Sequence, residues 1–319
     1  MKPRVALIGE CMLELSARGG EQPPSALQLG YGGDTLNTAV YLARLGVAAE
    51  YVTLLGDDRH SHWMMQCWQA EQVGTGLVGC LGGRVPGLYM IDTDSSGERS
   101  FSYWRGESPA RELFDDPGRV AKLERSLADY SLIYFSGISL SLYGEAGRER
   151  LFDMLARLRA GGARIAYDGN YRPAGWPDAD RAREEFTRAC SGADILLPTF
   201  DDEQALFGDA DPDATLARLR SCGAREMVIK LGASGCLVAS DDQVLEVPSC
   251  KVAQPVDTTA AGDSFNAGYL AGRLLGEPAG QAARWGHRLA AEVIQHRGAI
   301  LDAQQMPDLA GADSGEEHG

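Results

Sequence analysis

The stretch DTTAAGDSFNAG, Asp257 to Gly268, places two acids and a run of very small residues in front of a segment with helical apolar spacing. Ala260, Ala261 and Gly262 allow the backbone to approach a ligand closely. At a helix N-terminus their N–H groups would offer partial positive charge to an anion. A lone aspartate such as Asp263 would ordinarily be a helix cap. Beside an anion hole it can instead accept a hydroxyl proton, so the stretch predicts phosphoryl transfer with Asp263 as catalytic base.

Elsewhere the chain alternates buried apolar runs with amphipathic segments. Residues 4–8, 130–138 and 163–170 read as strands, and residues 35–46 read as a helix that stops at a glycine. This alternation predicts an α/β fold in which a mainly parallel sheet lies between helices on both faces. Residues 87–105 instead carry two β-rich runs around the turn residues Asp94, Ser95, Ser96 and Gly97, a pattern typical of a hairpin.

The hairpin interrupts the strand and helix units, so we expect it to project from the main sheet as a small accessory sheet or lid. We predict a single domain over residues 1–305, with lid segments at about 10–32 and 77–114. The end of the chain, residues 306–319, lacks an apolar anchor over its last residues and is predicted to be a flexible tail.

Composition narrows the classes of function. The 319 residues are 44% hydrophobic, and 30 basic against 45 acidic residues give a net charge of −15. Such a charge repels polyanions and argues against a nucleic-acid or membrane-surface partner, so an anionic substrate must be bound by a local basic cluster. With no apolar run of transmembrane length and no signal-peptide pattern, we expect a cytoplasmic protein.

One motif suggests a different class of enzyme. GTGLVG, residues 74–79, matches the dinucleotide pattern GxGxxG of nicotinamide oxidoreductases. A helical segment precedes it and strand-like residues follow, which reverses the strand-then-helix order that a pyrophosphate turn needs. We therefore interpret it as a helix-ending loop, and no GxxxxGK[ST] loop is present either.

Two signatures far apart in the chain resemble those of the ribokinase-like, or PfkB, carbohydrate kinases. They are YGGDTLNTAVYLARLG, residues 31–46, and DTTAAGDSFNAG, and the resemblance extends over roughly residues 4–300. It implies a three-layer α/β/α fold with a β-sheet lid, and ATP with Mg²⁺ as cofactors. It also implies Asp263 as the base and the backbone of Ala260, Ala261, Gly262 and Asp263 as the anion hole.

The sequence departs from the family pattern in two places. Many members have glycine where this chain has Ala260, although a cradle built from backbone N–H groups survives an alanine. The family element Asn-x-x-Glu, associated with magnesium and phosphate, is here TFDDE, with Thr199 and Asp202 at the two positions. Asp202 and Glu203 are left as possible metal ligands.

The sugar site is expected from matches in the first family signature, in the second lid segment and in one loop. Gly33, Asp34 and Asn37 match the sugar-binding start of the family, although a helix cap and a surface asparagine would explain the last two without it. Strand alternation puts Tyr103 and Arg105 on one face of the hairpin. An arginine fork suits a carboxylate. The substrate set implied by resemblance to family members acting on 2-keto-3-deoxygluconate comprises Gly33, Tyr89, Tyr103, Arg105 and Arg172, joined by Asp34 and Asn37.

The remaining expectations concern ATP, partners and rival functions. KLGASG is similar to the nucleotide-side strand and turn, which implies Lys230, Gly232 and Gly235 at ATP, although an ordinary strand-end turn has the same look. By analogy with relatives we expect a homodimer formed through the lid. The alternatives are a neutral-sugar kinase of the fructokinase or ribokinase type and a non-catalytic relative that binds a sugar acid.

Overall fold

The structure is a computed structural model that describes residues 3–17, 26–93, 99–240 and 243–310. The predicted hairpin turn at Asp94 to Gly97 and the end of the predicted tail, residues 311–319, lie outside the described residues.

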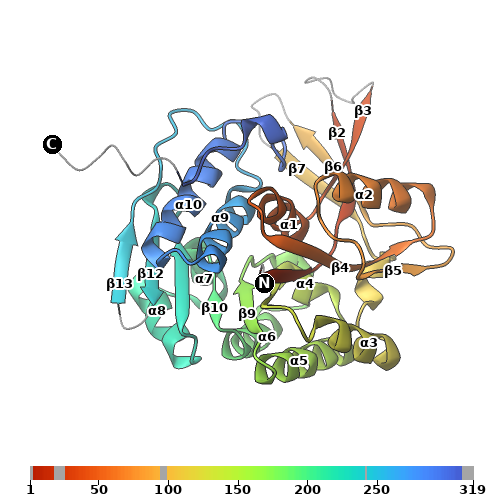
Figure 1. Cartoon of the computed structure of the whole chain (residues 1–319), viewed down its shortest axis with the longest axis horizontal. Helices are drawn as coiled ribbons and strands as arrows, with labels where there is room; N and C mark the ends of the chain where they lie inside the picture. Colours follow the sequence, from red (N-terminus) through yellow and green to blue (C-terminus); the bar gives the residue numbers. More distant parts are fainter. Residues whose placement is uncertain (1–2, 18–25, 94–98, 241–242, 311–319) are drawn as a thin grey trace.

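A mainly parallel sheet forms the centre of the molecule (Figure 1). Its strand order is β13-β12-β11-β10-β9-β8-β1-β4-β5, and every neighbouring pair from β11 to β5 is parallel. Within the described part of this sheet, only the edge formed by β12 and β13 pairs in antiparallel fashion. The bounds are β1 (Arg4–Ile8), β4 (Ala48–Gly56), β5 (Val78–Leu81), β8 (Leu132–Ser136), β9 (Arg164–Asp168), β10 (Ile195–Leu196), β11 (Glu226–Lys230), β12 (Cys236–Ser240) and β13 (Gln243–Val247).

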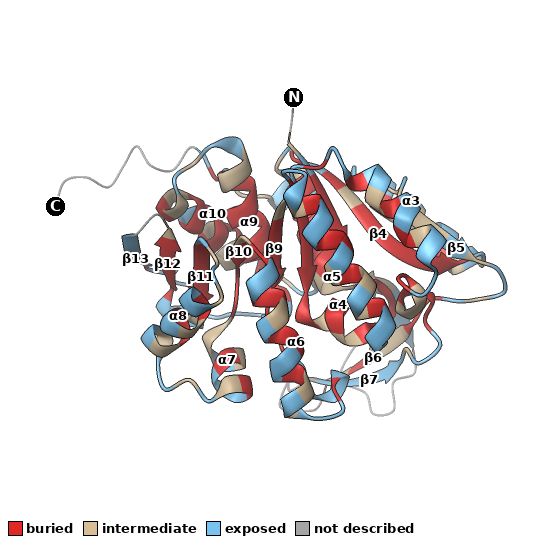
Figure 2. Ribbon diagram, turned by 90° about the horizontal axis from the view of Figure 1, so that it is seen from below, coloured by how far each residue is buried: buried red, intermediate tan, exposed pale blue. Residues whose placement is uncertain are grey.

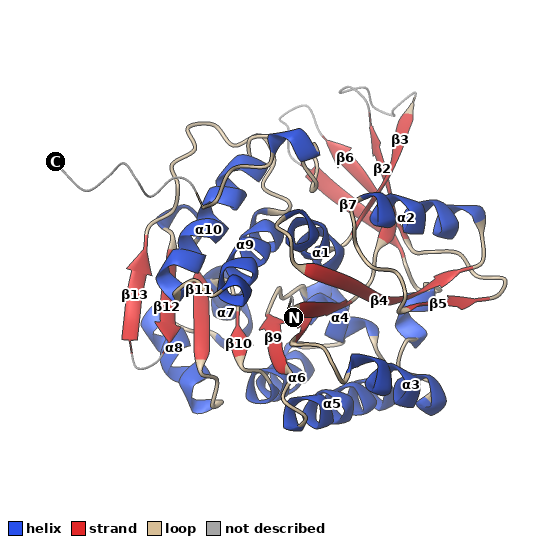
Figure 3. Cartoon of the chain, in the orientation of Figure 1, coloured by secondary structure: helices blue, strands red, loops and turns tan. Residues whose placement is uncertain are grey.

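Helices cover both faces of this sheet, because successive strand residues point to opposite sides. In β1, Val5 and Leu7 join one apolar cluster while Ala6 and Ile8 join the other. Figure 2 shows the buried strands between helices whose outer faces are exposed, and Figure 3 shows the alternation of strands and helices. One face carries α1 (Asp34–Arg44), α2 (Arg59–Ala70), α9 (Ala261–Leu275) and α10 (Ala279–Val293); the other carries α3 (Pro117–Leu127), α4 (Gly137–Leu142), α5 (Glu145–Ala160), α6 (Ala179–Gly192), α7 (Phe200–Phe207) and α8 (Pro212–Ser221).

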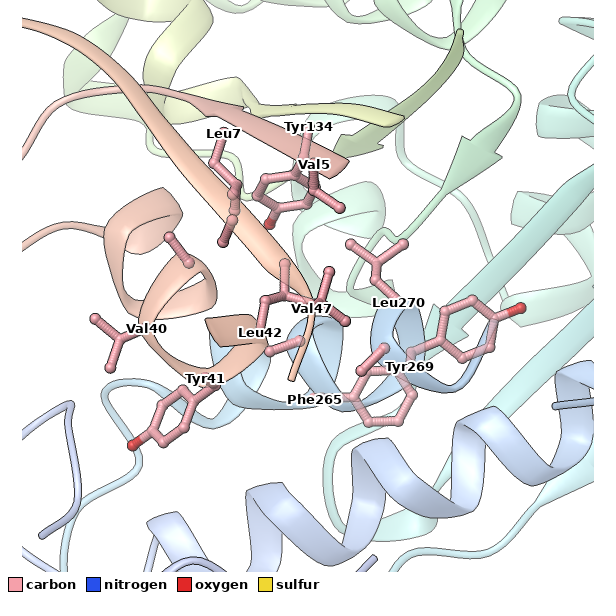
Figure 4. Close-up of a cluster of buried hydrophobic side chains, with 14 of the residues drawn as sticks. Val5, Leu7, Val40, Tyr41, Leu42, Val47, Tyr134, Phe265, Tyr269 and Leu270 are labelled. Atoms are coloured by element: carbon pink, nitrogen blue, oxygen red, sulfur yellow. The ribbon is translucent and has the colours of Figure 1, made fainter. Parts of the chain in front are cut away.

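The cluster under α1 and α9 fixes the two helices that carry the family-like signatures. Leu42 of α1 and Leu270 of α9 are fully buried and belong to one apolar cluster with the strand residue Tyr134 (Figure 4). Burying a leucine side chain contributes about 1.5–3 kcal/mol. The two signatures, more than two hundred residues apart in sequence, are therefore held side by side by apolar packing.

A second, smaller sheet projects from the main body (Figure 1). It contains β3 (Leu27–Gly32), β2 (Met12–Ala17), β6 (Leu88–Thr93) and β7 (Arg99–Trp104), in that order. The predicted hairpin is present as the antiparallel pair β6 and β7, and β2 joins it in parallel. The predicted second lid segment began at residue 77, but β5 pairs with β4 and belongs to the main sheet, so the excursion starts after β5.

The carboxyl ends of the parallel strands converge on one edge of the main sheet, where open α/β sheets bind ligands. Ser136, Asp168 and Lys230 are the last residues of β8, β9 and β11, and Glu10 follows β1 by two positions. The small sheet is attached at this same edge through the residues that follow β1. Among the described residues, no helix is both long and apolar enough to cross a bilayer.

Candidate active site

Asp263 lies in the first turn of α9, whose N-cap is Ala260. The first N–H groups of a helix have no partner four residues back. Here the amide of Ala261 donates to Thr258 O at 3.2 Å, and that of Ser264 donates to Ala260 O at 3.0 Å. Helix geometry therefore leaves the amides of Gly262 and Asp263 as the donors open to an anion, while the Ala261 amide, expected to share this role, is used by the turn.

The other acid of the motif, Asp257, orders the turn. Its Oδ1 accepts from the Thr259 amide at 3.1 Å and from the Thr259 hydroxyl at 2.7 Å. Its Oδ2 accepts from the Gly298 amide at 2.8 Å, so the turn is tied to the segment after α10. The two aspartates of the motif thus have different roles: Asp257 stabilises the turn, and Asp263 faces the site.

Asp263 is 7% exposed, and its carboxyl accepts a 2.9 Å hydrogen bond from Asn37 Nδ2. Burial raises its pKa well above the usual value, and the negative charge of Asp34 raises it further. The hydrogen bond from Asn37 and the charge of Lys230 act in the opposite direction, since both favour the carboxylate. A carboxylate with raised proton affinity is suited to remove a proton from an alcohol.

Asp34 is the first residue of α1 and is not its cap, since Gly33 occupies that position. Its Oδ2 accepts from Asn170 Nδ2 at 3.0 Å, and burial raises its pKa. A Cβ on Gly33 would lie 2.2 Å from Glu10 O, so glycine is required there for close backbone approach. Asn37, the other predicted substrate residue of α1, turns toward Asp263. Asp34 and Asn37 therefore contact different partners.

Lys230 occupies a buried position beside the anion hole. Its Nζ lies 3.2 Å from Asp168 Oδ1 and 3.1 Å from Asn266 Oδ1, and the residue is 7% exposed. A Cβ on Gly262 would lie only 3.6 Å from this Nζ. The ammonium is therefore placed where a phosphoryl group on the α9 amides would meet it.

One face of the small sheet presents an aromatic surface. Tyr89 and Tyr103 are direct cross-strand partners with ring centroids 6.1 Å apart, and Phe101 lies 6.3 Å from Tyr103. The Tyr89 hydroxyl donates to Glu14 of the neighbouring strand. A Cβ on Gly32 would come within 2.3 Å of that hydroxyl, so glycine makes room for it.

The two arginines predicted to bind a substrate carboxylate are each paired with a protein carboxylate. Arg105 forms an ion pair with the buried Glu10 and lies 6.0 Å from the centre of the Tyr103 ring. Arg172, with its side chain 57% exposed, lies 3.4 Å from Asp202. The Arg105–Glu10 pair joins the small sheet to the end of β1. The Arg172–Asp202 pair joins the loop after β9 to α7.

The predicted nucleotide turn contains two glycines with left-handed backbone. Gly232 has φ of +57° with no neighbour around a hypothetical Cβ, so its conformation alone explains glycine. Gly235 has φ of +106°, and a Cβ there would collide with Val247 O at 2.2 Å. The close packing of β13 against residue 235 is therefore sufficient to explain why this position is a glycine.

The two possible metal ligands differ in their surroundings. Glu203 is buried and forms a 2.6 Å ion pair with Arg218, and burial raises its pKa to about 7. This residue therefore does not fit a metal ligand. Asp202 is paired with Arg172 at 3.4 Å, and burial raises its pKa while Arg172 lowers it. No group of three metal-ligating side chains occurs in the described part of the chain, but Mg²⁺ commonly needs one carboxylate together with substrate phosphates, which Asp202 fits.

Comparison with known proteins decides the family. Residues 2–306 match the pfkB family of carbohydrate kinases. The chain belongs to this family. A 2-dehydro-3-deoxygluconokinase of Dickeya dadantii (strain 3937) is 44% identical over 310 residues, which cover 95% of this chain and 98% of that protein.

Solved structures confirm the expected ribokinase-like fold. The crystal structure of a 2-dehydro-3-deoxygluconokinase from Thermotoga maritima aligns with a TM-score of 0.82 and 23% identity, covering 95% of this chain and 98% of that one. An Escherichia coli putative ribokinase II in complex with ATP and Mg²⁺ aligns with a TM-score of 0.83 and 23% identity, covering 96% of each chain. The nicotinamide oxidoreductase reading of residues 74–79 is thereby rejected for this pfkB kinase; residues 74–77 form the expected loop after α2, whereas Val78 and Gly79 already belong to β5.

Several polar residues in this pfkB site were missed by sequence reasoning. Asp168 ends the buried strand β9 and Asn170 follows it by two positions, so both could have been found from their place at the binding edge. Asn170 has φ of +41°, a conformation that asparagine tolerates. Glu10 follows β1 in the same way, whereas Glu14 and Asn266 have no comparable signal, because only the pairing of β2 with β6 and the position of α9 reveal them.

Proposed function

We propose that this chain is a 2-dehydro-3-deoxygluconokinase, which transfers the γ-phosphoryl group of ATP to the 6-hydroxyl of 2-dehydro-3-deoxygluconate, also called 2-keto-3-deoxygluconate. The single observation that carries the proposal is the position of Asp263: a buried carboxylate in the same helical turn as two open amides, with the Lys230 ammonium next to them. The name of the Dickeya relative supplies the substrate.

In the proposed reaction, Asp263 accepts the proton of the 6-hydroxyl as its oxygen bonds to the γ-phosphorus. The bond from that phosphorus to the bridging oxygen of the β-phosphate breaks, and ADP leaves with the electron pair. The amides of Gly262 and Asp263 donate to the phosphoryl oxygens during transfer. Low dielectric around the buried carboxylate strengthens these interactions.

For the sugar acid, we assign the substrate carboxylate to Arg105 and Arg172. Each guanidinium group pairs with a protein carboxylate in this structure, that of Glu10 or that of Asp202, and this affinity for carboxylates supports the assignment. Tyr89 and Tyr103 would cover the apolar side of the carbon chain. The backbone at Gly33 and the side chains of Asp34 and Asn37 complete the proposed polyol contacts.

For ATP, Lys230 and the turn at Gly232 and Gly235 form the proposed phosphate side. Asp202 would hold Mg²⁺ together with the phosphates, and the ion when bound neutralises their negative charge. ATP as cosubstrate places the proposed activity in the cytoplasm.

The test is ADP release by the purified protein with ATP against a panel of sugars. The panel contains 2-dehydro-3-deoxygluconate, gluconate, fructose and ribose. We expect kcat/KM for 2-dehydro-3-deoxygluconate to exceed that for the neutral sugars fructose and ribose by at least about 100-fold, the discrimination given by one good charged contact. A preference for fructose or ribose would establish the neutral-sugar alternative, and binding of the acid without ADP release would establish a non-catalytic relative.

We also propose that the chain forms a homodimer through the small sheet. Leu27 and Leu29 on β3 and Trp104 on β7 are exposed by 41–58%, although large apolar side chains are usually covered. Analytical ultracentrifugation should give twice the chain mass, and Trp104→Lys should shift the protein toward monomer. A monomer in the unmodified protein at micromolar concentration would refute the dimer.

A further inference from the structure

Asn266 lies three residues after Asp263 on the same helix and is fully buried. Its Nδ2 donates to Asp168 Oδ2 at 2.8 Å and to the Tyr134 hydroxyl at 3.0 Å. Its Oδ1 accepts from Lys230 Nζ at 3.1 Å. A carboxamide is the side chain that can donate and accept in this way without carrying charge. One residue thus links three strands of the main sheet to the helix that bears the base.

The Lys230 side chain would have wide freedom without this network. A lysine ammonium is a point charge on a flexible four-carbon chain. Asn266 and Asp168 hold Nζ from two sides, and the third direction opens toward Gly262. Asn266 and Asp168 therefore set the position of the Lys230 ammonium beside the anion hole. In the described part of the chain, neither side chain has another contact with the predicted ATP turn.

We propose that Asn266 is a positioning residue for phosphoryl transfer, which acts by fixing the Lys230 ammonium beside the open amides of α9. This inference rests on the proposed function, because it requires a phosphoryl group at those amides. Through Lys230, Asn266 also influences Asp263, since a fixed positive charge near a carboxylate favours its ionised form. One carboxamide then serves both the transferred group and the base.

A purely structural role is the competing explanation, because any buried hydrogen-bonded asparagine contributes to stability. The two roles differ in their dependence on Lys230. If Asn266 acts through Lys230, its removal has little further effect once the ammonium is gone. If it only supports the fold, the two losses add.

The experiment is a double-mutant cycle with Asn266→Ala, Lys230→Met and the double variant. We expect kcat with 2-dehydro-3-deoxygluconate to fall about 100-fold in Lys230→Met and about tenfold in Asn266→Ala. The double variant should be within about threefold of Lys230→Met alone. Multiplicative losses would overturn the inference.

A pH profile gives a second readout that a structural role would not move. The acid limb of kcat/KM should shift to higher pH in Lys230→Met and, by less, in Asn266→Ala, because the ammonium no longer stabilises the Asp263 carboxylate. An unchanged limb in Asn266→Ala would count against the inference. The charged and titratable groups that act on or respond to Asp263 are Asp34, Asp168, Lys230, Tyr41 and Tyr134.

Tyr269→Phe is the matched control. This buried tyrosine lies on α9, and its hydroxyl donates to Glu226 at 2.7 Å, away from the site. We expect it to lower the melting temperature while leaving kcat and the pH limb unchanged. Thermal unfolding of all variants shows which are folded; if Asn266→Ala is unfolded, Asn266→Leu, which keeps the branched shape of asparagine without its polar atoms, replaces it in the cycle.

Nucleotide binding measured without sugar distinguishes a failure of this inference from a failure of the proposed function. The same cycle is measured on the dissociation constant of adenylyl imidodiphosphate by calorimetry, without sugar. If the unmodified protein turns over no sugar in the panel, the proposed function fails, whereas additive losses of nucleotide affinity in a protein that binds this analogue refute the positioning role.

Discussion

Asn37 on α1 donates a hydrogen bond to Asp263 on α9, 226 positions later in the chain, at 2.9 Å. This contact joins the two family signatures into one site, because the residue expected to bind sugar also controls the expected base. A hydrogen bond to the carboxylate favours its ionised form, while burial and the neighbouring Asp34 disfavour it. The proton affinity of Asp263 is therefore set by residues from both signatures.

Replacing Asp263 with asparagine tests the base. We expect kcat to fall by about 10³-fold or more, while sugar binding persists because the asparagine Oδ1 can still accept from Asn37. Single-turnover kinetics and calorimetric sugar binding measure the two effects. Turnover within a few-fold of the unmodified protein would remove Asp263 from this role.

The same variant makes a prediction for stability. The folded-state pKa of Asp263 is raised, so the fold favours the protonated form, and stability declines as pH rises from about 4 through that raised pKa. Asparagine removes this cost, and we expect a higher melting temperature at pH 7 but little change at pH 4. Scanning calorimetry at the two pH values is the measurement; equal shifts at both would contradict it.

Removing the Asn37 donor should move the pH profile. In Asn37→Ala the carboxylate loses a hydrogen bond that lowers its pKa, so the acid limb of kcat/KM is expected at higher pH. Thr38→Val is the matched control, because the Thr38 hydroxyl donates to the main-chain oxygen of Asp263 rather than to its carboxylate. A limb that moves equally in both variants would mean that packing, not the hydrogen bond, is responsible.

Arg105 tests the recognition of the sugar acid. Arg105→Met should raise KM for 2-dehydro-3-deoxygluconate by about 10–100-fold and leave the weak activity on neutral sugars unchanged. The substitution strands the buried Glu10, which destabilises by about 3–5 kcal/mol when a buried pair is broken. The double variant Glu10→Gln/Arg105→Met restores stability but not KM. Equal losses for acid and neutral sugars would refute the carboxylate assignment.

Asp202 and Glu203 are neighbours with different predicted effects. Asp202→Asn should raise the Mg²⁺ concentration for half-maximal activity by about tenfold, because a direct carboxylate ligand is lost. Glu203→Gln should leave that concentration unchanged and alter stability, since Glu203 pairs with Arg218. Magnesium titrations of both variants provide the comparison, and the reverse pattern would exchange their roles.

Much of the architecture could be predicted because its signals are local. Buried runs such as Val5 to Ile8 and the small residues before α9 carry their structural consequences in adjacent positions. The strand order, the parallel pairing of β2 with β6 and the placing of β5 in the main sheet could not be predicted, because register depends on contacts far apart in the chain.

The residues of the site also divide into those that a local sequence signal reveals and those that only the folded structure reveals. Asp263 was found because its motif is continuous, whereas Asn266, only three positions later, has meaning only beside Asp168 and Lys230 from two different strands. Arg105 was predicted to bind a substrate carboxylate, and its pairing with Glu10 became visible only when the ends of β1 and β7 were placed together.

The small sheet is attached to the body at the ends of two chain excursions, both within the first third of the sequence, while Lys230 and Asp263 come from the last third. Mutations in the first third of the sequence can therefore remodel most of the proposed sugar surface, Arg172 excepted, without disturbing the residues proposed to handle the phosphate. Descendants of one ancestral kinase could acquire a new substrate by mutation in this region and retain the reaction.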